Sequence, residues 1–275
     1  MRILVTGANG VCGSALLNLE HDVTFVDALP PREIFSEKKF IQTDLTDLDI
    51  LEELLKEHDA VIHMAASSAV NSDWDDVLKN NIIATKNLFD MCTQVGVGRI
   101  IFGSSNHTVG NYELYNAPEI YELNTVKRID VNYPVWPDSY YGISKVFAEN
   151  LGRYYADTKG LRFYSLRIGA ILNELENTPY AYAERGVSAG EWQRDDDKYN
   201  EKLKRLKAIW LSRRDFFQLI NKCLEHEGDL YNVFFATSDN IRSWLDLSDT
   251  KKMLGYAPED ASEDWNVLPE QYTKK

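Results

Sequence analysis

The 275-residue sequence has few cysteines and no long apolar segment. Its three cysteines, Cys12, Cys92 and Cys223, are odd in number and far apart, so neither a disulfide framework nor a zinc site is indicated. No run approaches the roughly 18 apolar residues that a membrane span needs, and no extended apolar stretch typical of a signal peptide follows Met1. We therefore expect a cytoplasmic protein with no metal site and no membrane partner.

Basic side chains are also in deficit, which excludes a further class of partner. The chain has 43 acidic and 30 basic residues, a formal net charge of −13. Such a surface repels nucleic acid and anionic membranes, although a local arginine cluster can still bind a small anion. Hydrophobic residues make up 44% of the chain, enough for one large domain or one domain with a small appendage.

Short apolar runs alternate with helical patterns over the first 168 residues. The patterns predict strands at 3–5, 21–27, 40–42, 60–64, 99–102 and 162–168, and helices at 11–19, 48–57, 74–95 and 139–159. Alternation of this kind favours parallel strands joined by right-handed crossovers. The predicted fold is an α/β, Rossmann-type doubly wound parallel sheet.

The alternation breaks after Ile168. Residues 173–207 are polar and contain the charge run 194–198, which is typical of an exposed loop or a surface helix. Beyond it we predict a strand at 208–211, a helix from the capping pattern at 212–215 to about 225, a strand at 231–236 and a helix at 243–254. We expect a dinucleotide-binding domain over 1–170 and a small substrate-binding lobe over 171–275, partly interleaved with the sheet.

The stretch VTGANGVCG places Gly7, Gly10 and Gly13 between the first strand and the first helix. Glycine permits a tight turn and lets backbone N–H groups approach a pyrophosphate, while the helix N-terminus adds partial positive charge. Asp27 ends the second strand, where an acid accepts hydrogen bonds from an adenosine ribose. A carboxylate also repels a 2′-phosphate, so NAD is favoured over NADP, although Arg32 leaves NADP open. The alternative role for Asp27 is a strand-end cap.

A tyrosine and a lysine four residues apart share one helix face at Tyr141 and Lys145. An ammonium group beside a phenol lowers the phenol's pKa, which predicts a base for an alcohol proton. Tyr155 and Lys159 repeat the spacing, but roughly 21 Å further along the helix, away from the carboxyl edge of the sheet. We therefore favour the first pair as functional and expect the second on the helix surface.

Polar side chains crowd the end of the predicted strand 99–102 in the stretch GSSNHTVGNY, at 103–112. A solvated turn accounts for such a cluster, and so does a site that holds a polar molecule.

Several motifs together resemble the extended short-chain dehydrogenase/reductase family. They are TGANGVCG, the acid at Asp27, DL at 44–45, HMAA at 63–66, the strand-ending serine and YGISK. A narrower likeness to uronate dehydrogenases and to archaeal NAD-dependent glucose-6-phosphate dehydrogenases is carried by SSNHTVG, YGISKVFAENLGRYY, RIGA, WLSRRDF and SDNIRSWLDLS. Two features depart from both groups: residues 173–204 form a longer segment, and Ala170 stands where uronate dehydrogenases have a serine.

The resemblance implies NAD-dependent oxidation at C1 of a small sugar or sugar acid, either a hexuronate to an aldarolactone or a sugar phosphate to its lactone. It implies catalytic roles for Ser105, which orients the alcohol, Tyr141, which takes the proton, and Lys145, which holds the nicotinamide ribose. The implied substrate-binding residues are Ser68, Asn106, His107 and Arg205. The implied cofactor-binding residues are Gly7, Asn9, Gly10, Val11, Gly13, Asp27, Asp44, Leu45, Ala65, Ala66, Asn81, Tyr141, Lys145 and Ile168.

Other interpretations stay open at this stage. His107 could be a structural loop histidine, Arg205 one more exposed basic residue, and Asn81 a helix-surface residue. Arg205 would suit a carboxylate or a phosphate, and Arg213 or Arg214 could add to a phosphate site. The whole chain could instead be a nucleotide-sugar epimerase or dehydratase with tightly bound NAD, or a non-catalytic dinucleotide-binding protein. By analogy with the family, the long predicted helices suggest a homodimer or a larger homo-oligomer.

Overall fold

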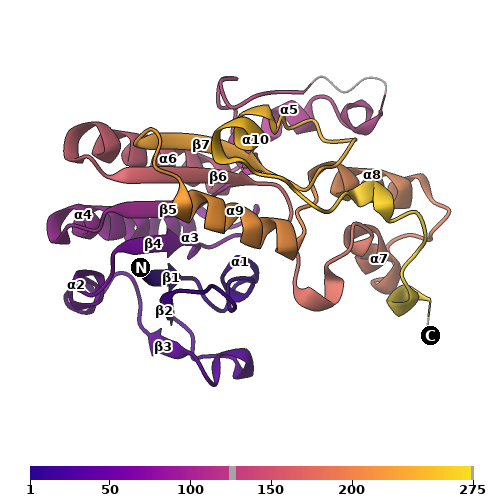
Figure 1. Ribbon diagram of the computed structural model, residues 1–275. Helices are drawn as coiled ribbons and strands as arrows, with labels where there is room; N and C mark the ends of the chain where they lie inside the picture. The colour runs from indigo at the N-terminus through magenta and orange to yellow at the C-terminus, as the bar shows by residue number, and fades with distance from the viewer. Residues whose placement is uncertain (124–127, 274–275) are drawn as a thin grey trace. The chain divides into compact units, whose positions relative to one another are not determined.

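A computed structural model describes residues 1–123 and 128–273 of the chain. Its centre is a seven-stranded parallel sheet in the order β3-β2-β1-β4-β5-β6-β7 (Figure 1). The strands are β1 (Arg2–Thr6), β2 (Asp22–Asp27), β3 (Lys39–Gln42), β4 (Ala60–His63), β5 (Arg99–Ser105), β6 (Arg162–Ile168) and β7 (Tyr231–Ala236). The strand order reverses beside β1, and this reversal defines the switch point at which doubly wound sheets bind ligands. The predicted fold class is confirmed.

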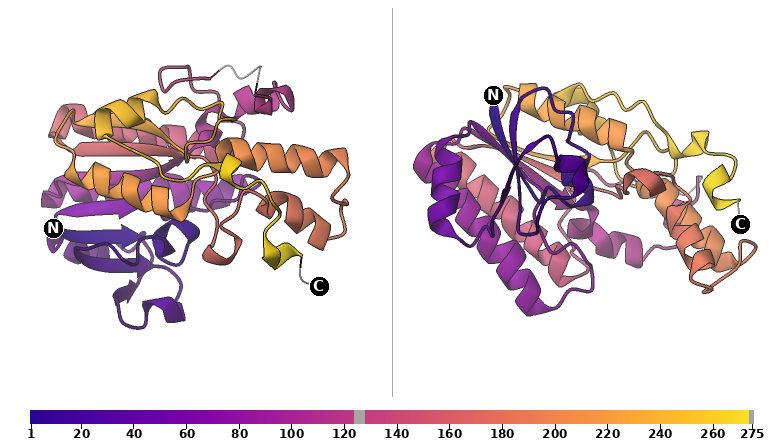
Figure 2. Two further views of the ribbon diagram at one scale, coloured as in Figure 1. Left: turned by 45° about the vertical axis from the view of Figure 1, so that its right-hand side comes forward. Right: turned by 90° about the horizontal axis from the view of Figure 1, so that it is seen from below.

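Three helices pack on one face of the sheet: α2 (Leu48–Lys56), α4 (Ala84–Val95) and α6 (Tyr140–Lys159). They lie on the same side of the strands in the right-hand view of Figure 2. The core between them and the sheet is aromatic and aliphatic, with Phe89 of α4 edge-on to Phe102 and Phe163. Burial of this apolar face fixes α6 against β5, and the carboxyl end of β5 thereby meets the first turns of α6.

Strand β5 is longer than predicted, because it continues through Gly103, Ser104 and Ser105. All seven of its residues are buried, as expected for an inner strand of a parallel sheet. The two serines therefore lie inside the protein and not in a solvated turn.

Three predicted elements are wrong in type or extent. Helix α1 spans only Val11–Ser14, so the expected helix at 11–19 is much shorter. Residues 208–211 are not a strand: Ala208 and Ile209 end helix α8 (Asp197–Ile209), and Trp210 forms a single bridge with Ala170. The last helix, α10, begins at Ser248, five residues later than predicted, and ends at Leu254 as predicted.

The predicted helix at 74–95 is present but not uniform. It consists of α3 (Trp74–Val77), a π-helical segment at Leu78–Ile83, and α4. π-Helical turns inside α-helices are frequent at functional sites, and this one contains the buried Asn81.

The chain divides into two compact units, each built from several segments. The first contains Met1–Asn111, Val135–Arg167 and Cys223–Phe234, and the second contains Tyr112–Pro134, Ile168–Lys222 and Phe235–Lys275. Helix α5 (Gly110–Leu114) crosses from the first to the second, and α9 (Arg213–Glu225) crosses back.

The charged segment of the second unit is a packed pair of helices. Helix α7 (Ala181–Ser188) contacts α8, and Glu184 between them is only 2% exposed. Arg194, from the charge run, donates two hydrogen bonds to Glu184, and Tyr199 donates a third. A polar sequence folds here because its buried carboxylate is fully paired.

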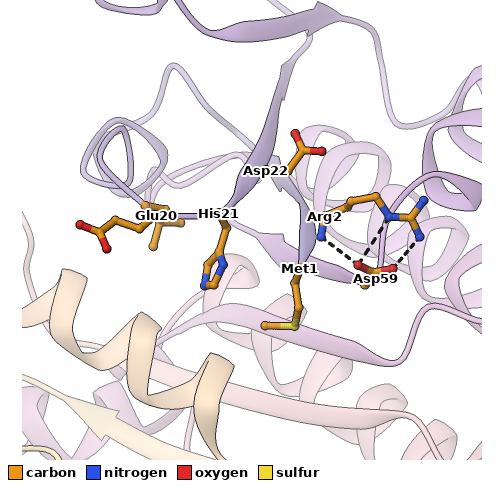
Figure 3. A pocket seen from close by; sticks show the side chains of 7 residues that line it. Met1, Arg2, Glu20, His21, Asp22 and Asp59 are labelled. Carbon is orange, nitrogen blue, oxygen red and sulfur yellow. Dashed lines mark hydrogen bonds and ion pairs between the residues drawn. The ribbon is translucent and has the colours of Figure 1, made fainter.

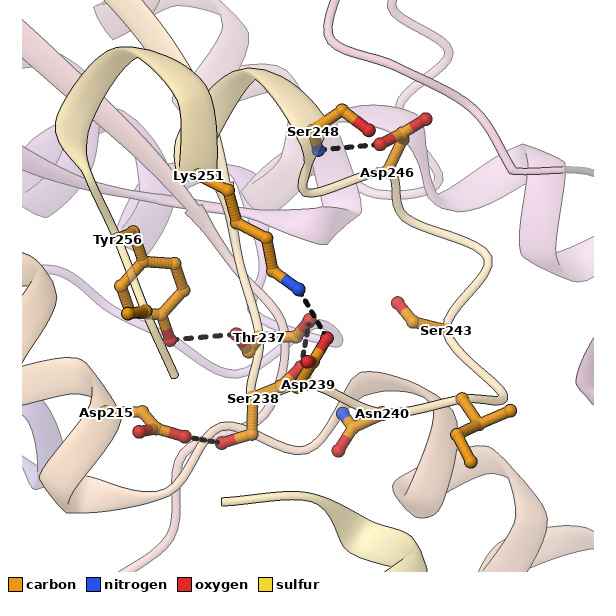
Figure 4. A network of polar contacts seen from close by, with 12 residues as sticks. Asp215, Thr237, Ser238, Asp239, Asn240, Ser243, Asp246, Ser248, Lys251 and Tyr256 are labelled. Carbon is orange, nitrogen blue, oxygen red and sulfur yellow. Dashed lines mark hydrogen bonds and ion pairs between the residues drawn. The ribbon is translucent and has the colours of Figure 1, made fainter. Parts of the chain in front are cut away.

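A second polar network lies around Asp215, which is fully buried in the same unit (Figure 4). Its carboxylate accepts a 2.6 Å hydrogen bond from Ser238 Oγ and another from the backbone N–H of Glu259. Nearby, Tyr256 donates to the carbonyl of Thr237. The capping pattern at 212–215 is confirmed, since the Asp215 N–H donates to Ser212 Oγ at 3.0 Å.

A hollow opens at the amino ends of the strands in the first unit, lined by Met1, Arg2, Leu19, Glu20, His21, Asp22 and Asp59 (Figure 3). Its main interaction is the exposed ion pair between Arg2 and Asp59, at 2.6 Å. The hollow lies at the edge of the sheet opposite the carboxyl end of β5. Across the described ranges, no helix is both long and apolar enough to cross a membrane.

Candidate active site

Ser105, Tyr141 and Lys145 come together where β5 ends and α6 begins. Ser105 is the last residue of β5, and its Oγ accepts a hydrogen bond from the His107 N–H at 3.2 Å. Ser139 caps α6 by accepting from the Gly142 N–H, which places Tyr141 in the first turn. The Ser105 and Tyr141 hydroxyls are hydrogen-bonded to each other. The sequence prediction of these three residues as one cluster therefore has a geometric basis.

Lys145 is fully inside the protein, one helical turn beyond Tyr141. Its Nζ donates to the carbonyl of Gly103 at 2.7 Å and lies 5.4 Å from the centroid of the Tyr141 ring. Burial lowers the pKa of Lys145 to about 8, against smaller upward contributions from the charges of Cys12 and Glu149. The ammonium group is therefore close to the point of releasing its proton at neutral to mildly basic pH.

The pKa of Tyr141 moves opposite to the prediction. Burial raises it to about 12, and the hydrogen bond from Ser105 offsets only part of this rise. The expected lowering of the phenol's pKa is wrong for the protein alone, because desolvation of the phenolate outweighs the hydrogen bond from Ser105, and the charges of Cys12 and Asp138 raise the pKa further.

The prediction that Tyr155 and Lys159 both lie on the helix surface is wrong for Tyr155 and confirmed for Lys159. Tyr155 packs in the hydrophobic core between α6 and the sheet and is 7% exposed, while Lys159 is exposed at the last turn of the helix. The same spacing thus serves packing at one end of α6 and a polar cluster at the other.

His107 and Asp138 form a buried pair beside Tyr141. The His107 Nδ1 lies 2.6 Å from Asp138 Oδ2, and the two side chains are 16% and 6% exposed. The His107 ring stands edge-on to the Tyr141 ring at 5.9 Å. Burial alone would raise the pKa of Asp138, but hydrogen bonds and charge from His107 and a hydrogen bond from Ser139 lower it below the ordinary value. Asp138 is therefore a carboxylate at neutral pH.

Asn106 and Ser68 differ in how they are held. Asn106 is 1% exposed, and its Nδ2 has no hydrogen-bond partner among the described residues. A buried donor without a partner is costly and is typical of a functional position. Ser68 is exposed in the segment after β4. Their roles in substrate binding stay predictions.

Two positions of the glycine loop have no room for a side chain, because the protein's own backbone packs against them. Gly7 has φ +70°, and a Cβ there would lie 2.5 Å from the Ala65 backbone nitrogen at the end of β4. A Cβ at Gly13 would lie 2.3 Å from the Gly7 carbonyl oxygen. Gly10 and Val11 form the exposed tip of the turn. Because α1 has only four residues, the turn's backbone must supply most of the polar groups and the helix dipole contributes less than predicted.

Asp27 joins the glycine loop to the end of β2. Its Oδ2 accepts from the Asn9 N–H at 2.9 Å and its Oδ1 from the Leu29 N–H at 3.0 Å. Each carboxylate oxygen can accept a further hydrogen bond, so Asp27 fits a ribose diol while also capping the strand. Arg32 is tied to the same loop, since its Nη1 donates to the Asn9 carbonyl.

The remaining predicted cofactor positions are held in different ways. Asn81 uses both amide atoms to fix the backbone of Ser67 and also donates to Ser144 of α6. Leu45 lies in the hydrophobic core, and Asp44 is exposed and accepts two hydrogen bonds from Thr46. Partly buried positions follow β4 at Ala65 and Ala66, and Ile168 is a buried residue of the second unit.

Arg205 lies in the second unit and is not an exposed basic residue. Its Nε and Nη2 donate to the two carboxylate oxygens of Glu113 at 3.0 and 3.1 Å. Tyr121 also donates to Glu113. The carboxylate of Glu113 thus balances the charge of Arg205 within the second unit. Arg205 Nη1 makes no hydrogen bond with the described residues.

Two residues around the Ser105, Tyr141 and Lys145 cluster were not predicted from the sequence. Asp138 precedes Tyr141 by three positions, and Glu149 follows Lys145 by one helical turn. Glu149 accepts hydrogen bonds from Ser104, Ser165 and Arg167, all buried. The i, i+4 spacing of Lys145 and Glu149 on one helix face was a signal for Glu149.

A model of the NAD dependent epimerase/dehydratase family matches residues 3–182. An NAD-dependent glucose-6-phosphate dehydrogenase from Haloferax volcanii is 33% identical, covering 94% of each chain, and an L-arabinose 1-dehydrogenase (NAD(P)(+)) from the same organism is 32% identical, covering 95% of this chain and 97% of the relative.

A solved structure shows the same fold. The crystal structure of glucuronic acid dehydrogenase from Chromohalobacter salexigens superposes with a TM-score of 0.76 at 31% identity, covering 98% of this chain and 88% of that one. The chain belongs to the NAD-dependent epimerase/dehydratase family.

Proposed function

We propose that this protein is an NAD-dependent dehydrogenase that oxidises the C1 hydroxyl of a small sugar or sugar acid to a lactone. The observation that carries the proposal is the cluster of Ser105, Tyr141 and Lys145 facing the glycine loop. Cys12 of that loop interacts electrostatically with both Tyr141 and Lys145, so the loop and the cluster lie close together. The relative named L-arabinose 1-dehydrogenase supports C1 as the reacting carbon, and the relative named glucose-6-phosphate dehydrogenase supports a sugar substrate.

A bound NAD⁺ would supply the hydride acceptor for C1, and its positive charge would favour the phenolate form of Tyr141. Tyr141 takes the proton of the C1 hydroxyl, and Ser105 orients that hydroxyl through the hydrogen bond it shares with Tyr141. Lys145 is held by the Gly103 carbonyl at a fixed depth, where its ammonium group contributes positive potential beneath the phenol. The buried surroundings strengthen each of these interactions, because little water screens them.

The same proposal extends to residues that await a direct test. Gly7, Gly10 and Gly13 cradle the pyrophosphate, and Asp27 accepts from the adenosine ribose. Asn106 and His107 contact the sugar, and Arg205 contributes to the substrate lobe. The protein works in the cytoplasm, in keeping with three free cysteines, and acts as a homodimer or larger homo-oligomer.

The test is formation of NADH, followed by absorbance, with glucuronate, galacturonate, glucose, L-arabinose and glucose 6-phosphate in parallel. We expect one of these to give stoichiometric NADH and a lactone product. Turnover of a UDP-sugar with no net NADH would instead identify an epimerase, and absence of NADH with every sugar would refute the dehydrogenase.

A further inference from the structure

Two glycines make room for the pair of His107 and Asp138. A Cβ at Gly110 would lie 1.9 Å from Asp138 Oδ2, so a side chain there would displace the carboxylate. A Cβ at Gly142 would lie 2.4 Å from the His107 carbonyl oxygen. The chain thus has glycine at both points where the pair presses against the backbone, which indicates that its position is built into the site.

The pairing fixes which nitrogen of a neutral His107 carries the proton. Asp138 is ionised, and an ionised carboxylate can only accept hydrogen bonds. The 2.6 Å contact therefore requires the hydrogen on Nδ1. The other oxygen, Oδ1, accepts from Ser139 Oγ at 2.8 Å, so the carboxylate cannot turn away without losing a second bond. The remaining nitrogen, Nε2, is then a hydrogen-bond acceptor.

Nε2 makes no hydrogen bond with the described residues, although the imidazole is only 16% exposed. An acceptor in this position calls for a donor on the bound molecule. The carboxylate of Asp138, 2.6 Å from the ring, also adds negative charge that disfavours an anionic group beside the imidazole whenever the ring is neutral. A sugar hydroxyl meets both conditions, whereas a carboxylate or phosphate meets neither.

We propose that Asp138 is a positioning residue that holds His107 as the Nδ1–H tautomer, so that Nε2 accepts a hydrogen bond from a hydroxyl of the substrate. The proposal rests on the sugar dehydrogenase function proposed above and narrows it: His107 recognises a neutral hydroxyl and not the acid group. Asn106 complements it, because its free Nδ2 can donate to a substrate oxygen. Any anionic group of the substrate must then bind elsewhere.

The tautomer is measured first, without substrate. Nitrogen-15 NMR of imidazole-labelled protein at about pH 8.5, above the ordinary histidine range, distinguishes a protonated Nδ1 from a protonated Nε2. We expect His107 to carry its proton on Nδ1 in the parent protein and to show a mixture of tautomers in Asp138→Ala. Ser139→Ala is the matched control, because it removes the other partner of Asp138 and the cap of α6 but leaves the Nδ1 contact, so the tautomer should not change.

The functional consequence is measured with monodeoxy analogues of whichever sugar is oxidised. We expect Asp138→Ala to lower kcat/KM by about 10- to 100-fold, the scale of the loss when the acceptor that orients a metal-ligating histidine is removed. For one analogue, the one that lacks the hydroxyl bound by Nε2, the parent protein and Asp138→Ala should be equally slow. Asp138→Asn, which can accept or donate, should give an intermediate loss.

The experiments distinguish failure of the Asp138 positioning role from failure of the sugar dehydrogenase function on which it rests. If no sugar is oxidised but the tautomer is Nδ1–H, the function fails and the positioning geometry stands. If a sugar is oxidised but Asp138→Ala loses the same factor with every analogue, Asp138 is merely structural. A proton on Nε2, or on both nitrogens, in the parent protein overturns the proposal directly.

Discussion

The buried ion pair between Glu149 and Arg167 gives a prediction whose size follows from the structure. Both side chains are 4% exposed, and Glu149 accepts from Arg167 Nε at 3.0 Å and Nη2 at 2.8 Å. Its Oε1 also accepts from Ser104 and Ser165. Glu149→Gln leaves the guanidinium of Arg167 buried without its counter-charge, which costs about 3–5 kcal/mol. That is a large part of the roughly 5–15 kcal/mol that stabilises an ordinary protein.

Site alignment depends on the same pair. Gly103, Ser104 and Ser105 bond in turn to Lys145, Glu149 and Tyr141, so the end of β5 is fixed against α6 by three successive contacts. Removing the charge of Glu149 also removes a contribution that raises the pKa of Lys145, which should fall further below its present value of about 8. Turnover should therefore drop together with stability.

The assay is urea unfolding followed by circular dichroism for Glu149→Gln, Arg167→Met and the double variant. We expect each single variant to lose several kcal/mol and the double variant to lose less than their sum, with a coupling of about 3 kcal/mol. If the two losses are simply additive, or if each single variant stays within about 0.5 kcal/mol of the parent, the reasoning from uncompensated buried charge is refuted.

Three further predictions concern single residues. Tyr141→Phe should keep its NAD affinity but lose about 10²- to 10⁴-fold in kcat. Tyr155→Phe, in the core, should keep most of the parent kcat, and equal losses of kcat in both variants would contradict the assignment of Tyr141 as the base. Gly7→Ala should lose NAD affinity in a calorimetric titration, because its Cβ meets Ala65. The control is Gly96→Ala, which has a similar φ of +85° but no atom within 4 Å of its Cβ, and it should lose only stability. Burial lowers the pKa of His63 to about 3 from an ordinary 6.5, so the folded state binds fewer protons than the unfolded state between these pH values. The free energy of unfolding should therefore fall as the pH drops from about 6.5 to 3, and this dependence should be weaker in His63→Asn. An unchanged pH dependence in that variant would refute the reasoning.

The sheet and most of its helices could be predicted because apolar periodicity marks them directly. The run at 208–211 was misread, since four apolar residues fit the end of a buried helix as well as a strand. The extension of β5 through Gly103, Ser104 and Ser105 could not be seen, because these residue types favour turns, whereas here they continue an inner strand. They also bond to Lys145, Glu149 and Tyr141 on α6.

Part of the site could also be predicted from local sequence patterns. Tyr141, Lys145 and the glycines stand at fixed local spacings, which a sequence displays. The partner of His107 lies 31 residues away at Asp138, and the partner of Arg205 lies 92 residues away at Glu113. Such pairs depend on tertiary folding, so local patterns do not reveal them. The raised pKa of Tyr141 has the same origin, because burial is not a property of the motif.

The central claim is that Tyr141 and Ser105 activate the C1 hydroxyl for hydride transfer to NAD. The most direct measurement follows the label from a sugar deuterated at C1, during a single turnover with NAD in excess. The account predicts that deuterium appears in the NADH and that Tyr141→Phe abolishes the transfer. NADH formed without deuterium, or deuterium transferred at the parent rate by Tyr141→Phe, would contradict it.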